Sequence, residues 1–543
     1  MNEAIPGLDR SFAQFLAGRS GLYGAAREVF SELAARVSLA LEEGHSCLPV
    51  TAEERALLQA SPLVSDGGRT PLVVHNGRLY LHRYYRYETR LADQIKAMAA
   101  LCLDPGRGEE LVASYFESDP EVVDWQKEAA RIALRKALTI VCGGPGTGKT
   151  TTVVKILAIL LQNAEGRLPE IALAAPTGKA AMRLSESVGG SVKRIEFPGR
   201  IAEALPTTAS TLHRLLGVLR DSPQFRHNRE NPLPFDIVVV DEASMVDLAL
   251  MSKLVDALKP GARLLLLGDK DQLASVESGA VLGDFIRSLP DNTVTLQKTY
   301  RFDENIKMLA EAIKAAEGES AWTLLKDPSA ENISLLGSEF FETLIEPYAR
   351  FMARVQRPGD LDLPEIFSFF NSFRILCAVH YGSRGIDAVN RRIELALARR
   401  GFMSRTEAWY PGRPVLVTRN DYGLELFNGD IGICLHDPDS GDLKVWFEWP
   451  AGGYKSFSPH RLPRCETVFA MTIHKSQGSE FDEVAVILPE EDNPILSREL
   501  LYTAVTRAKK TVNLVADKEI LRLAVSRHTV RNSGLAELLA QKD

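Results

Sequence analysis

The glycine-rich segment at residues 143–150 constrains this chain more than any other feature of its sequence. It reads Gly-Gly-Pro-Gly-Thr-Gly-Lys-Thr, which fits the phosphate-loop pattern G-x-x-x-x-G-K followed by Ser or Thr. It follows an expected buried strand, Leu138–Cys142, and opens an expected helix, Thr151–Leu161, which is the context that this loop requires. The alternative interpretation, a glycine-rich turn that binds nothing, leaves that context unexplained.

A phosphate loop binds a nucleoside triphosphate through its backbone and two side chains. Glycines let the backbone N–H groups surround phosphate oxygens, and the following helix N-terminus favours negative charge there. We expect Lys149 to reach the β- and γ-phosphates and Thr150 to ligate Mg²⁺. The predicted nucleotide-binding residues of the loop are Gly143, Gly144, Pro145, Gly146, Thr147, Gly148, Lys149, Thr150 and Thr151.

Polar side chains follow two further buried strands. The run Ile237–Val240 ends at Asp241 and Glu242, and the run Leu264–Leu267 precedes a polar turn that contains Gln272. Because ligands lie at the carboxyl ends of parallel strands, we expect Asp241 to hold Mg²⁺ and Glu242 to accept a proton from attacking water. Gln272 is then placed to sense the γ-phosphate. A solvated acidic cap and a plain turn are the alternatives, and the upstream phosphate loop argues against both.

Apolar strands alternate with helical segments in two stretches of the chain, which is typical of parallel sheets with flanking helices. The expected strands include Ile171–Ala175 in the first stretch and Thr467–Met471 in the second. The sequence therefore predicts an α/β fold with one lobe at residues 119–290, including a short polar hairpin at about 222–234, and a second at 291–400 and 465–543. Residues 1–118 are expected to form a mainly helical partner-contact domain, with two short strands joined by a turn at Asn76 and Gly77. Residues 401–464, rich in glycine, proline and aromatic side chains, predict a small inserted β-domain.

Length and composition set limits on the class of protein. At ~150 residues per domain, 543 residues suggest three or four domains. With 64 Lys and Arg against 71 Asp and Glu, the net charge of −7 argues against coating of nucleic acid by bulk charge, although it permits a local basic groove.

The six cysteines are far apart and form no C-x-x-C pair, which argues against a disulfide scaffold or structural zinc. Apolar runs far below the ~20 residues that cross a bilayer predict a cytoplasmic protein without a membrane partner.

The second lobe contributes two candidate arginines: Arg301 stands at its start, within Thr299–Phe302, and Arg507 stands late in the chain, within Leu500–Ala508. An arginine supplied across a cleft stabilises charge on a transferring γ-phosphoryl group, whereas an ordinary surface arginine only pairs with a neighbouring carboxylate. Together with the phosphate loop they indicate an ATP-hydrolysing site. The same loop serves kinases, transporters and motors, so it does not define what the energy drives.

The order of the motifs resembles that of superfamily 1 DNA helicases, and within them the RecD family, the alpha subunit of exodeoxyribonuclease V. The resemblance spans about residues 121–517 and implies two RecA-like lobes and an SH3-like barrel for the insertion. The segments that carry it are Asp124–Lys127, the phosphate loop, Ala175–Ala181, Thr211–Gly217, Val240–Met245, Gly268–Leu273, Thr299–Arg301, Thr472–Phe481 and Leu500–Ala508.

The resemblance also implies roles for single residues. Gln126 matches a position that reads the adenine edge, while Arg301 and Arg507 match γ-phosphate arginines that complete the site when the lobes close. With them, the expected catalytic residues are Lys149, Glu242 and Gln272. The positions that match strand-facing residues, whose donors suit backbone contact, are Pro176, Thr177, Lys179, His213, Thr472 and His474.

The implied function is that of an ATP-dependent 5′→3′ DNA helicase, the motor subunit of an exonuclease V complex that acts in double-strand break repair by recombination. Its expected cofactors are ATP and Mg²⁺, and its expected partners are single-stranded DNA, duplex ends and RecB-like and RecC-like subunits. A stand-alone RecD-like helicase, a non-catalytic assembly subunit and an RNA-directed helicase are the alternatives. The intact catalytic set argues against the second, and backbone contacts alone do not exclude the third.

Overall fold

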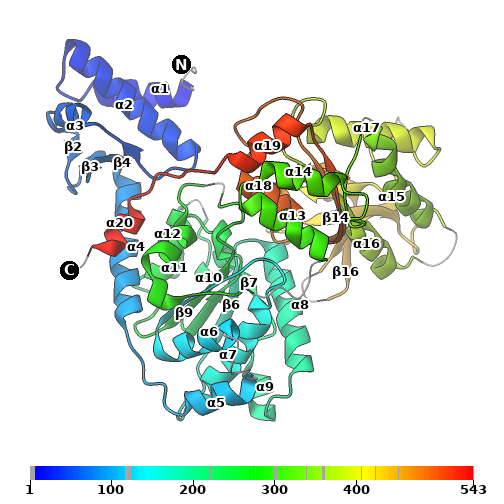
Figure 1. Cartoon of the computed structure of the whole chain (residues 1–543), viewed down its shortest axis with the longest axis horizontal. Coiled ribbons are helices and arrows are strands. Elements are labelled where there is room, and N and C mark those ends of the chain that lie inside the picture. The colour runs from blue at the N-terminus through cyan, green and yellow to red at the C-terminus, as the bar shows by residue number, and fades with distance from the viewer. Residues whose placement is uncertain are drawn as a thin grey trace.

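The computed structural model describes residues 7–116, 124–220, 222–275, 277–297, 303–337, 339–357, 361–404, 407–421, 423–449 and 452–541. Figure 1 shows an N-terminal region at upper left, a first lobe below it and a second lobe to the right. Each lobe is built on its own sheet, and the fold is α/β with parallel sheets.

The first lobe is a parallel sheet with the strand order β10-β5-β9-β8-β6-β7. Alternate residues of its central strands enter two separate apolar clusters, one on each face, which explains why these strands are apolar throughout. Its strands are β5 (Leu138–Cys142), β6 (Ile171–Ala175), β7 (Ser210–Thr211), β8 (Ile237–Val240), β9 (Arg263–Gly268) and β10 (Thr293–Thr295). Its helices are α6 (Trp125–Arg135), α7 (Lys149–Asn163), α8 (Gly178–Arg194), α9 (Gly199–Ala204), α10 (Leu212–Leu216), η1 (Ala243–Met245), α11 (Leu248–Asp256), α12 (Val281–Ser288) and η2 (Pro290–Asn292).

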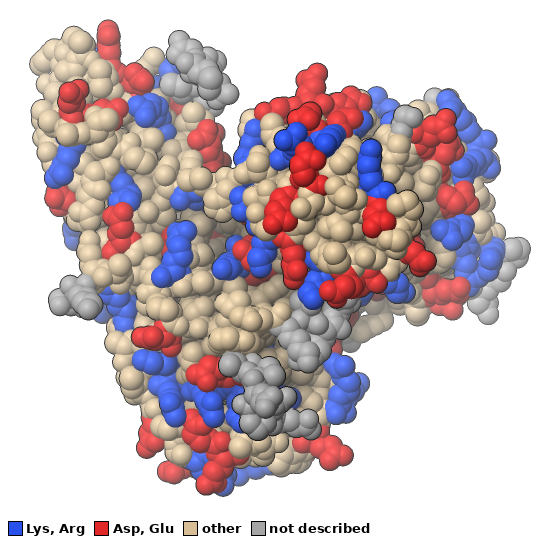
Figure 2. Space-filling view, in the orientation of Figure 1, with Lys and Arg blue, Asp and Glu red and all other residues tan. Residues whose placement is uncertain are grey.

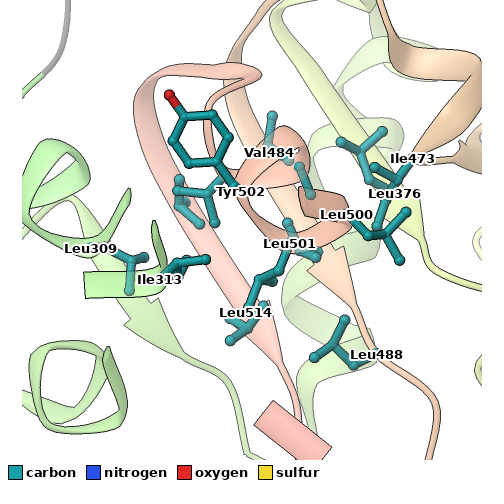
Figure 3. Packing of buried hydrophobic residues seen from close by; sticks show 14 of the residues in the cluster. Leu309, Ile313, Leu376, Ile473, Val484, Leu488, Leu500, Leu501, Tyr502 and Leu514 are labelled. Carbon is teal, nitrogen blue, oxygen red and sulfur yellow. The ribbon is translucent and has the colours of Figure 1, made fainter. Parts of the chain in front are cut away.

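The second lobe is a parallel sheet with the order β11-β20-β19-β12-β18. Figure 3 shows how Leu309 and Ile313 approach Leu501 and Leu514 in its core. Its strands are β11 (Ile333–Leu335), β12 (Phe373–Cys377), β18 (Ala470–Thr472), β19 (Phe481–Ile487) and β20 (Ala508–Val515). Its helices are α13 (Glu304–Lys314), α14 (Gly318–Lys326), α15 (Phe340–Val355), α16 (Leu363–Ser372), α17 (Ile386–Arg399), η4 (His474–Ser476), α18 (Arg498–Val505) and α19 (Lys518–Ser526).

The inserted segment forms an antiparallel sheet with the order β16-β15-β14-β13-β17. Its elements are β13 (Pro414–Val417), β14 (Ile431–His436), β15 (Leu443–Glu448), β16 (Tyr454–Phe457), η3 (Pro459–Arg461) and β17 (Cys465–Thr467). One expected strand, Thr467–Met471, is divided in the structure: its first residue ends β17 in this sheet, and its last two lie in β18 of the second lobe.

The N-terminal region combines helices with a small sheet of order β1-β4-β3-β2. The predicted turn at Asn76 and Gly77 joins β3 to β4, and both residues have positive φ angles, 46° and 70°. The elements are α1 (Gly7–Ala17), α2 (Gly24–Glu42), β1 (Leu48–Pro49), α3 (Ala52–Gln59), β2 (Val64–Ser65), β3 (Leu72–His75), β4 (Arg78–Leu81), α4 (His82–Ala100) and α5 (Gly108–Tyr115). Helix α4 leads directly from β4 to the side of the first lobe (Figure 1).

The C-terminal helix α20 (Leu535–Ala540) leaves the second lobe and packs against α4 and α12 (Figure 1). Leu535 and Leu539 enter the apolar cluster of the first lobe, and the buried Glu88 of α4 accepts hydrogen bonds from Ser533 Oγ and the Gly534 N–H. The structure thus differs from the expected domain limits, which placed residues 465–543 in the second lobe. It also differs at residue 290, because β10 pairs with β5 of the first lobe.

The surface carries both signs of charge. Figure 2 shows Lys and Arg interspersed with Asp and Glu over the visible face. All six cysteines are free thiols, so no disulfide supports the fold. Within the described ranges, no helix has the length and apolar character needed to cross a membrane.

Candidate nucleotide-binding and strand-contact site

The predicted phosphate loop lies between β5 and α7. It turns at Gly146 and Gly148, whose φ angles of 77° and 82° lie in the region that favours glycine. Lys149, the first residue of α7, donates hydrogen bonds to the carbonyls of Gly143 (2.6 Å) and Gly144 (3.0 Å). These contacts hold the ammonium across the loop. It lies at the N-terminus of α7, where the helix dipole favours a bound anion such as a phosphate group.

Two carboxylates follow β8 at the same edge of the sheet. Desolvation and the neighbouring charge of Glu242 raise the pKa of Asp241, and the Lys149 ammonium opposes the shift. Glu242 has a φ of 52°, which is uncommon for a non-glycine residue and places its side chain differently from an ordinary strand end. The Asp241 carboxylate and the Thr150 hydroxyl line one cavity, and oxygen groups of this kind are the ligands that Mg²⁺ prefers.

Arg507 of the second lobe contacts Gln272 of the first. Its Nη2 donates to Gln272 Oε1 at 2.8 Å, and the two residues are only 2% and 5% exposed. Its Nε and Nη1 donate to the carbonyls of Thr503 (3.1 Å) and Ser479 (3.2 Å) of its own lobe. The backbone of the second lobe therefore aims the guanidinium across the interface, and two predicted site residues meet there.

A second polar contact between the lobes lies beside the first. Asp269, just after β9, accepts hydrogen bonds from the Tyr502 hydroxyl (3.1 Å) and from Gln272 Nε2 (3.3 Å). Burial raises the pKa of Asp269, while the Lys149 ammonium lowers it. Gln477 Nε2 also donates across the interface, to the carbonyl of Leu273, at 2.8 Å. The sequence motifs contain Asp269, Tyr502 and Gln477, but no role was predicted for them.

The predicted nucleotide site opens into one cavity of about 640 Å³, to which both lobes contribute. Arg183 of α8 also lines it, donates to the Glu480 carbonyl at 2.9 Å and was missed by sequence reasoning. Burial lowers the pKa of Arg183 to about 10, so this guanidinium is a desolvated cation that faces the cavity. The predicted site residues that line the cavity are Pro145, Gly146, Gly148, Lys149, Thr150, Thr151, Asp241, Glu242, Gln272 and Arg507.

Other predicted nucleotide-binding residues in the described part of the chain do not line this cavity. Gln126, in the first turn of α6, donates from Nε2 to the carbonyl of Thr147 at 3.4 Å, which brings its amide to the phosphate loop. Arg301 lies outside the described residues. Gly143 and Gly144 lie at the start of the loop, where they accept from the lysine ammonium.

Three predicted strand-contact residues lie where β6 enters α8. Pro176 directly follows β6, and Thr177 caps α8 by accepting a hydrogen bond from the Ala180 N–H at 3.2 Å. Lys179 lines a second cavity, of about 410 Å³, between α8, α10 and the inserted sheet. The Arg214 guanidinium lies 4.7 Å from the centre of the Phe427 ring, so α10 contacts the inserted domain beside this cavity.

The environment of Lys179 is unusual for a surface cation. Burial lowers its pKa to about 7, and the charges of Arg183 and Arg374 act in the same direction. The carboxylates of Glu448 and Asp430, on the side of the inserted domain, oppose the shift. A phosphate placed in this cavity would add to that opposing effect and favour the charged ammonium.

The other predicted strand contacts are not gathered in that cavity. His213 of α10 packs its ring 5.6 Å from that of Phe225. Thr472 ends β18, is 4% exposed and accepts a hydrogen bond from the Lys475 N–H at 3.3 Å. Burial lowers the pKa of His474 to about 4, so its imidazole is neutral near pH 7. The structure therefore spreads these residues over both lobes.

A phosphate loop in one parallel-sheet lobe, faced by an arginine of a second, defines a two-lobed P-loop nucleotide triphosphatase. Two family models agree: an AAA domain matches residues 126–278, and a UvrD-like helicase C-terminal domain matches residues 467–515. Sequence relatives narrow the class further. The chain belongs to the RecD family.

Three relatives support this assignment. The RecBCD enzyme subunit RecD of Mycolicibacterium smegmatis is 42% identical over 491 residues, which cover 89% of this chain and 86% of that protein. The protein of the same name from Haemophilus influenzae is 36% identical over 86% of this chain and 81% of its own length. The ATP-dependent RecD2 DNA helicase of Deinococcus radiodurans is 34% identical over 85% of this chain and 58% of its own length.

Proposed function

We propose that this chain is the 5′→3′ translocating motor of a RecBCD-type exonuclease V complex. As a RecD-family protein it is an ATP-dependent DNA helicase of superfamily 1 that acts in recombinational repair. Its two lobes match the RecA-like arrangement that the family resemblance implies. Direction, partner subunits and the roles of single residues are the parts that the proposal adds.

One observation carries the motor assignment in this proposal: the nucleotide cavity is lined by groups of both lobes. Arg507 of the second lobe contacts Gln272 of the first at 2.8 Å, next to Lys149 and Glu242 in the same cavity. Changes at the γ-phosphate therefore act directly on the contact between lobes. The predicted strand contacts Lys179 and His474 belong to different lobes, so a change in the lobe contact moves one grip relative to the other.

The roles in hydrolysis follow from these positions. Lys149 neutralises charge on the β- and γ-phosphates, Glu242 accepts the proton of the attacking water, and Arg507 stabilises the γ-phosphoryl group during transfer. Thr150 and Asp241 would hold Mg²⁺, which when bound shields the phosphate oxygens. The position of Asp241, partly buried and with a raised pKa, fits such a role because a cation favours the ionised carboxylate.

The alternative of a stand-alone helicase finds less support among the relatives. RecBCD subunits from two organisms reach 42% and 36% identity, against 34% for the RecD2 helicase. The alternative of a non-catalytic assembly subunit does not account for the complete set of cavity groups, from Lys149 to Arg507. We therefore propose RecB-like and RecC-like partners.

A strand-displacement assay on duplexes with a single-stranded tail tests the function. The chain is expected to unwind substrates with a 5′ tail in the presence of Mg²⁺ and ATP, and to leave 3′-tailed substrates intact. The Glu242→Gln variant is the matched control, because it removes the proton acceptor and keeps the side-chain size. Unwinding only from 3′ tails contradicts the direction, while equal unwinding by the variant contradicts the site. Affinity purification from the native host tests for the two partner subunits.

A pH effect on strand binding follows from Lys179. Since its pKa lies at about 7 before DNA binds, the free lysine is mostly charged at pH 6 and mostly neutral at pH 8. A phosphate contact requires the charged form, so affinity for an oligothymidylate is expected to fall by up to about tenfold as pH rises over this range. Fluorescence anisotropy measures the affinity.

Two variants isolate this effect. Lys179→Arg keeps a charge throughout the range and is expected to bind with little pH dependence. Lys193→Ala removes an exposed lysine from the same helix and should keep the dependence. A wild-type affinity that stays constant from pH 6 to pH 8, or a dependence retained by Lys179→Arg, would show that Lys179 does not contact the strand.

A further inference from the structure

A basic cavity of about 340 Å³ lies between the N-terminal region and the first lobe, apart from the nucleotide site. Its walls come from α4, from the predicted hairpin and from α11. Helix α4 runs beside α11 along the edge of the first lobe (Figure 1). Its basic and aromatic lining residues include Arg83, Arg86, Tyr87, Arg90, Phe225 and Lys253.

The cavity carries an excess of positive charge. Asp256 is the one carboxylate among its lining residues, and it pairs with Arg90 and accepts a hydrogen bond from Gln94 at 3.3 Å. Arg83 and Arg86 are exposed, and neither forms an ion pair with a carboxylate in the described part of the chain. Two guanidinium groups therefore remain available to an anion in the cavity.

Lys253 of α11 joins the two walls formed by α4 and the hairpin. Its Nζ donates to the Pro223 carbonyl at 2.9 Å and lies 5.4 Å from the Phe225 ring and 5.9 Å from the Tyr87 ring. Asp247, whose charge also reaches Lys253, accepts a backbone N–H in the first turn of α11. The ammonium is thus held at the cavity wall by fixed contacts.

The cavity adjoins the predicted path of the bound strand. Phe225 lines the cavity and also packs its ring 5.6 Å from that of His213, a predicted strand contact. The family resemblance assigns His213 to the motor's own strand. Because Phe225 contacts His213, the cavity that holds Arg83, Arg86 and Lys253 lies next to this predicted strand contact.

We propose that this cavity is a second DNA-contact site, which binds the phosphate backbone of the duplex ahead of the motor or of the displaced strand. The proposal rests on the proposed helicase function and extends it to α4 of the N-terminal region. Arginine forks suit phosphate oxygens, and the partly buried rings of Tyr87 and Phe225, which line the cavity, offer apolar contact to sugar and base. Backbone contacts of this kind position DNA without reading its sequence.

The test compares Arg83→Ala/Arg86→Ala with a matched control, Arg55→Ala/Arg69→Ala. The control also removes two exposed arginines of the N-terminal region, so both variants change the net charge equally. Anisotropy measures affinity for an oligothymidylate, a 5′-tailed duplex and a fork with two tails, between about 50 and 200 mM salt. Loss of two phosphate contacts is expected to reduce the slope of log affinity against log salt concentration by about two. Over this range, wild type should therefore lose roughly tenfold more affinity than the Arg83→Ala/Arg86→Ala variant.

Each outcome decides the proposal. Weaker binding of both the tailed duplex and the fork assigns the cavity to the duplex, and weaker binding of the fork alone assigns it to the displaced strand. Unchanged binding of all three, or an equal loss on the oligothymidylate, overturns it. Unchanged DNA binding with loss of a co-purifying partner shows instead that an acidic protein segment occupies the cavity.

ATP hydrolysis stimulated by oligothymidylate is expected to be normal in the Arg83→Ala/Arg86→Ala variant. The absence of such hydrolysis in wild type would contradict the helicase function itself.

Discussion

Lys149→Gln is expected to lower kcat for ATP hydrolysis by at least roughly 10²–10³-fold, with the chain still folded. The lysine ammonium spans the phosphate loop through hydrogen bonds of 2.6 and 3.0 Å to two loop carbonyls, at the N-terminus of α7. A glutamine amide is shorter and uncharged, so it supplies no cation to the charge that forms between the β- and γ-phosphates. Phosphate release, with and without oligothymidylate, measures the loss.

Lys193→Gln provides the matched control for this prediction. Lys193 is an exposed lysine of α8, so the substitution makes the same chemical change away from the loop and should leave kcat within about twofold of wild type. Circular dichroism and thermal melting show whether Lys149→Gln remains folded. Near-normal hydrolysis by a folded Lys149→Gln chain would mean that the assigned loop is not the catalytic site.

The buried strands of the lobes could be predicted closely because their signal is local. The expected runs Leu138–Cys142, Ile171–Ala175 and Ile237–Val240 are β5, β6 and β8 with the same limits. Strands covered by helices on both faces are continuous apolar runs, bounded by polar turns, and both features can be read within a few residues. The α/β class of the lobes follows from the alternation of such runs with helices.

The elements that were predicted less well depend on partners distant in the sequence. The residues of the expected strand Thr467–Met471 fit one strand, but its two ends pair in different sheets. Thr467 pairs with β13 of the inserted sheet, whereas Ala470 and Met471 pair with β12 of the second lobe. Helix α20 follows α19 in the chain, yet Leu535 and Leu539 pack in the first lobe. Periodicity indicates that a face is apolar, and it does not indicate which surface that face will meet.

The same distinction applies to the candidate site. The phosphate loop and Asp241 are recognised from contiguous patterns, because their geometry is set by one strand and its following turn. The roles of Tyr502 and Arg183 depend on the approach of the other lobe, since Tyr502 bonds Asp269 across the interface and Arg183 bonds the Glu480 carbonyl. The lowered pKa of Lys179 has the same origin, because the inserted domain covers part of α8.

Arg507→Ala is expected to lower kcat by about 10³–10⁵-fold, the range typical of an arginine that completes a phosphoryl-transfer site, while nucleotide binding changes much less. Three backbone and side-chain acceptors fix this guanidinium at 2.8–3.2 Å, and one of them, Gln272, belongs to the opposite lobe. The substitution removes the cation that the second lobe contributes to the cavity. Steady-state hydrolysis gives kcat, and a fluorescent non-hydrolysable ATP analogue gives the affinity.

Two further variants separate catalysis from folding. Arg507→Lys keeps a charge in the buried position but lacks the planar fork that bonds Gln272 and the two carbonyls, so kcat is expected to stay far below wild type. Arg522→Ala removes an exposed arginine of α19 whose ion pairs are solvated, and hydrolysis should be unaffected. If analogue affinity falls while kcat at saturating ATP stays near wild type in folded Arg507→Lys, the residue binds nucleotide uniformly and does not act in the transition state. A folded Arg507→Ala chain that hydrolyses ATP normally would remove the link between the lobes on which the motor mechanism depends.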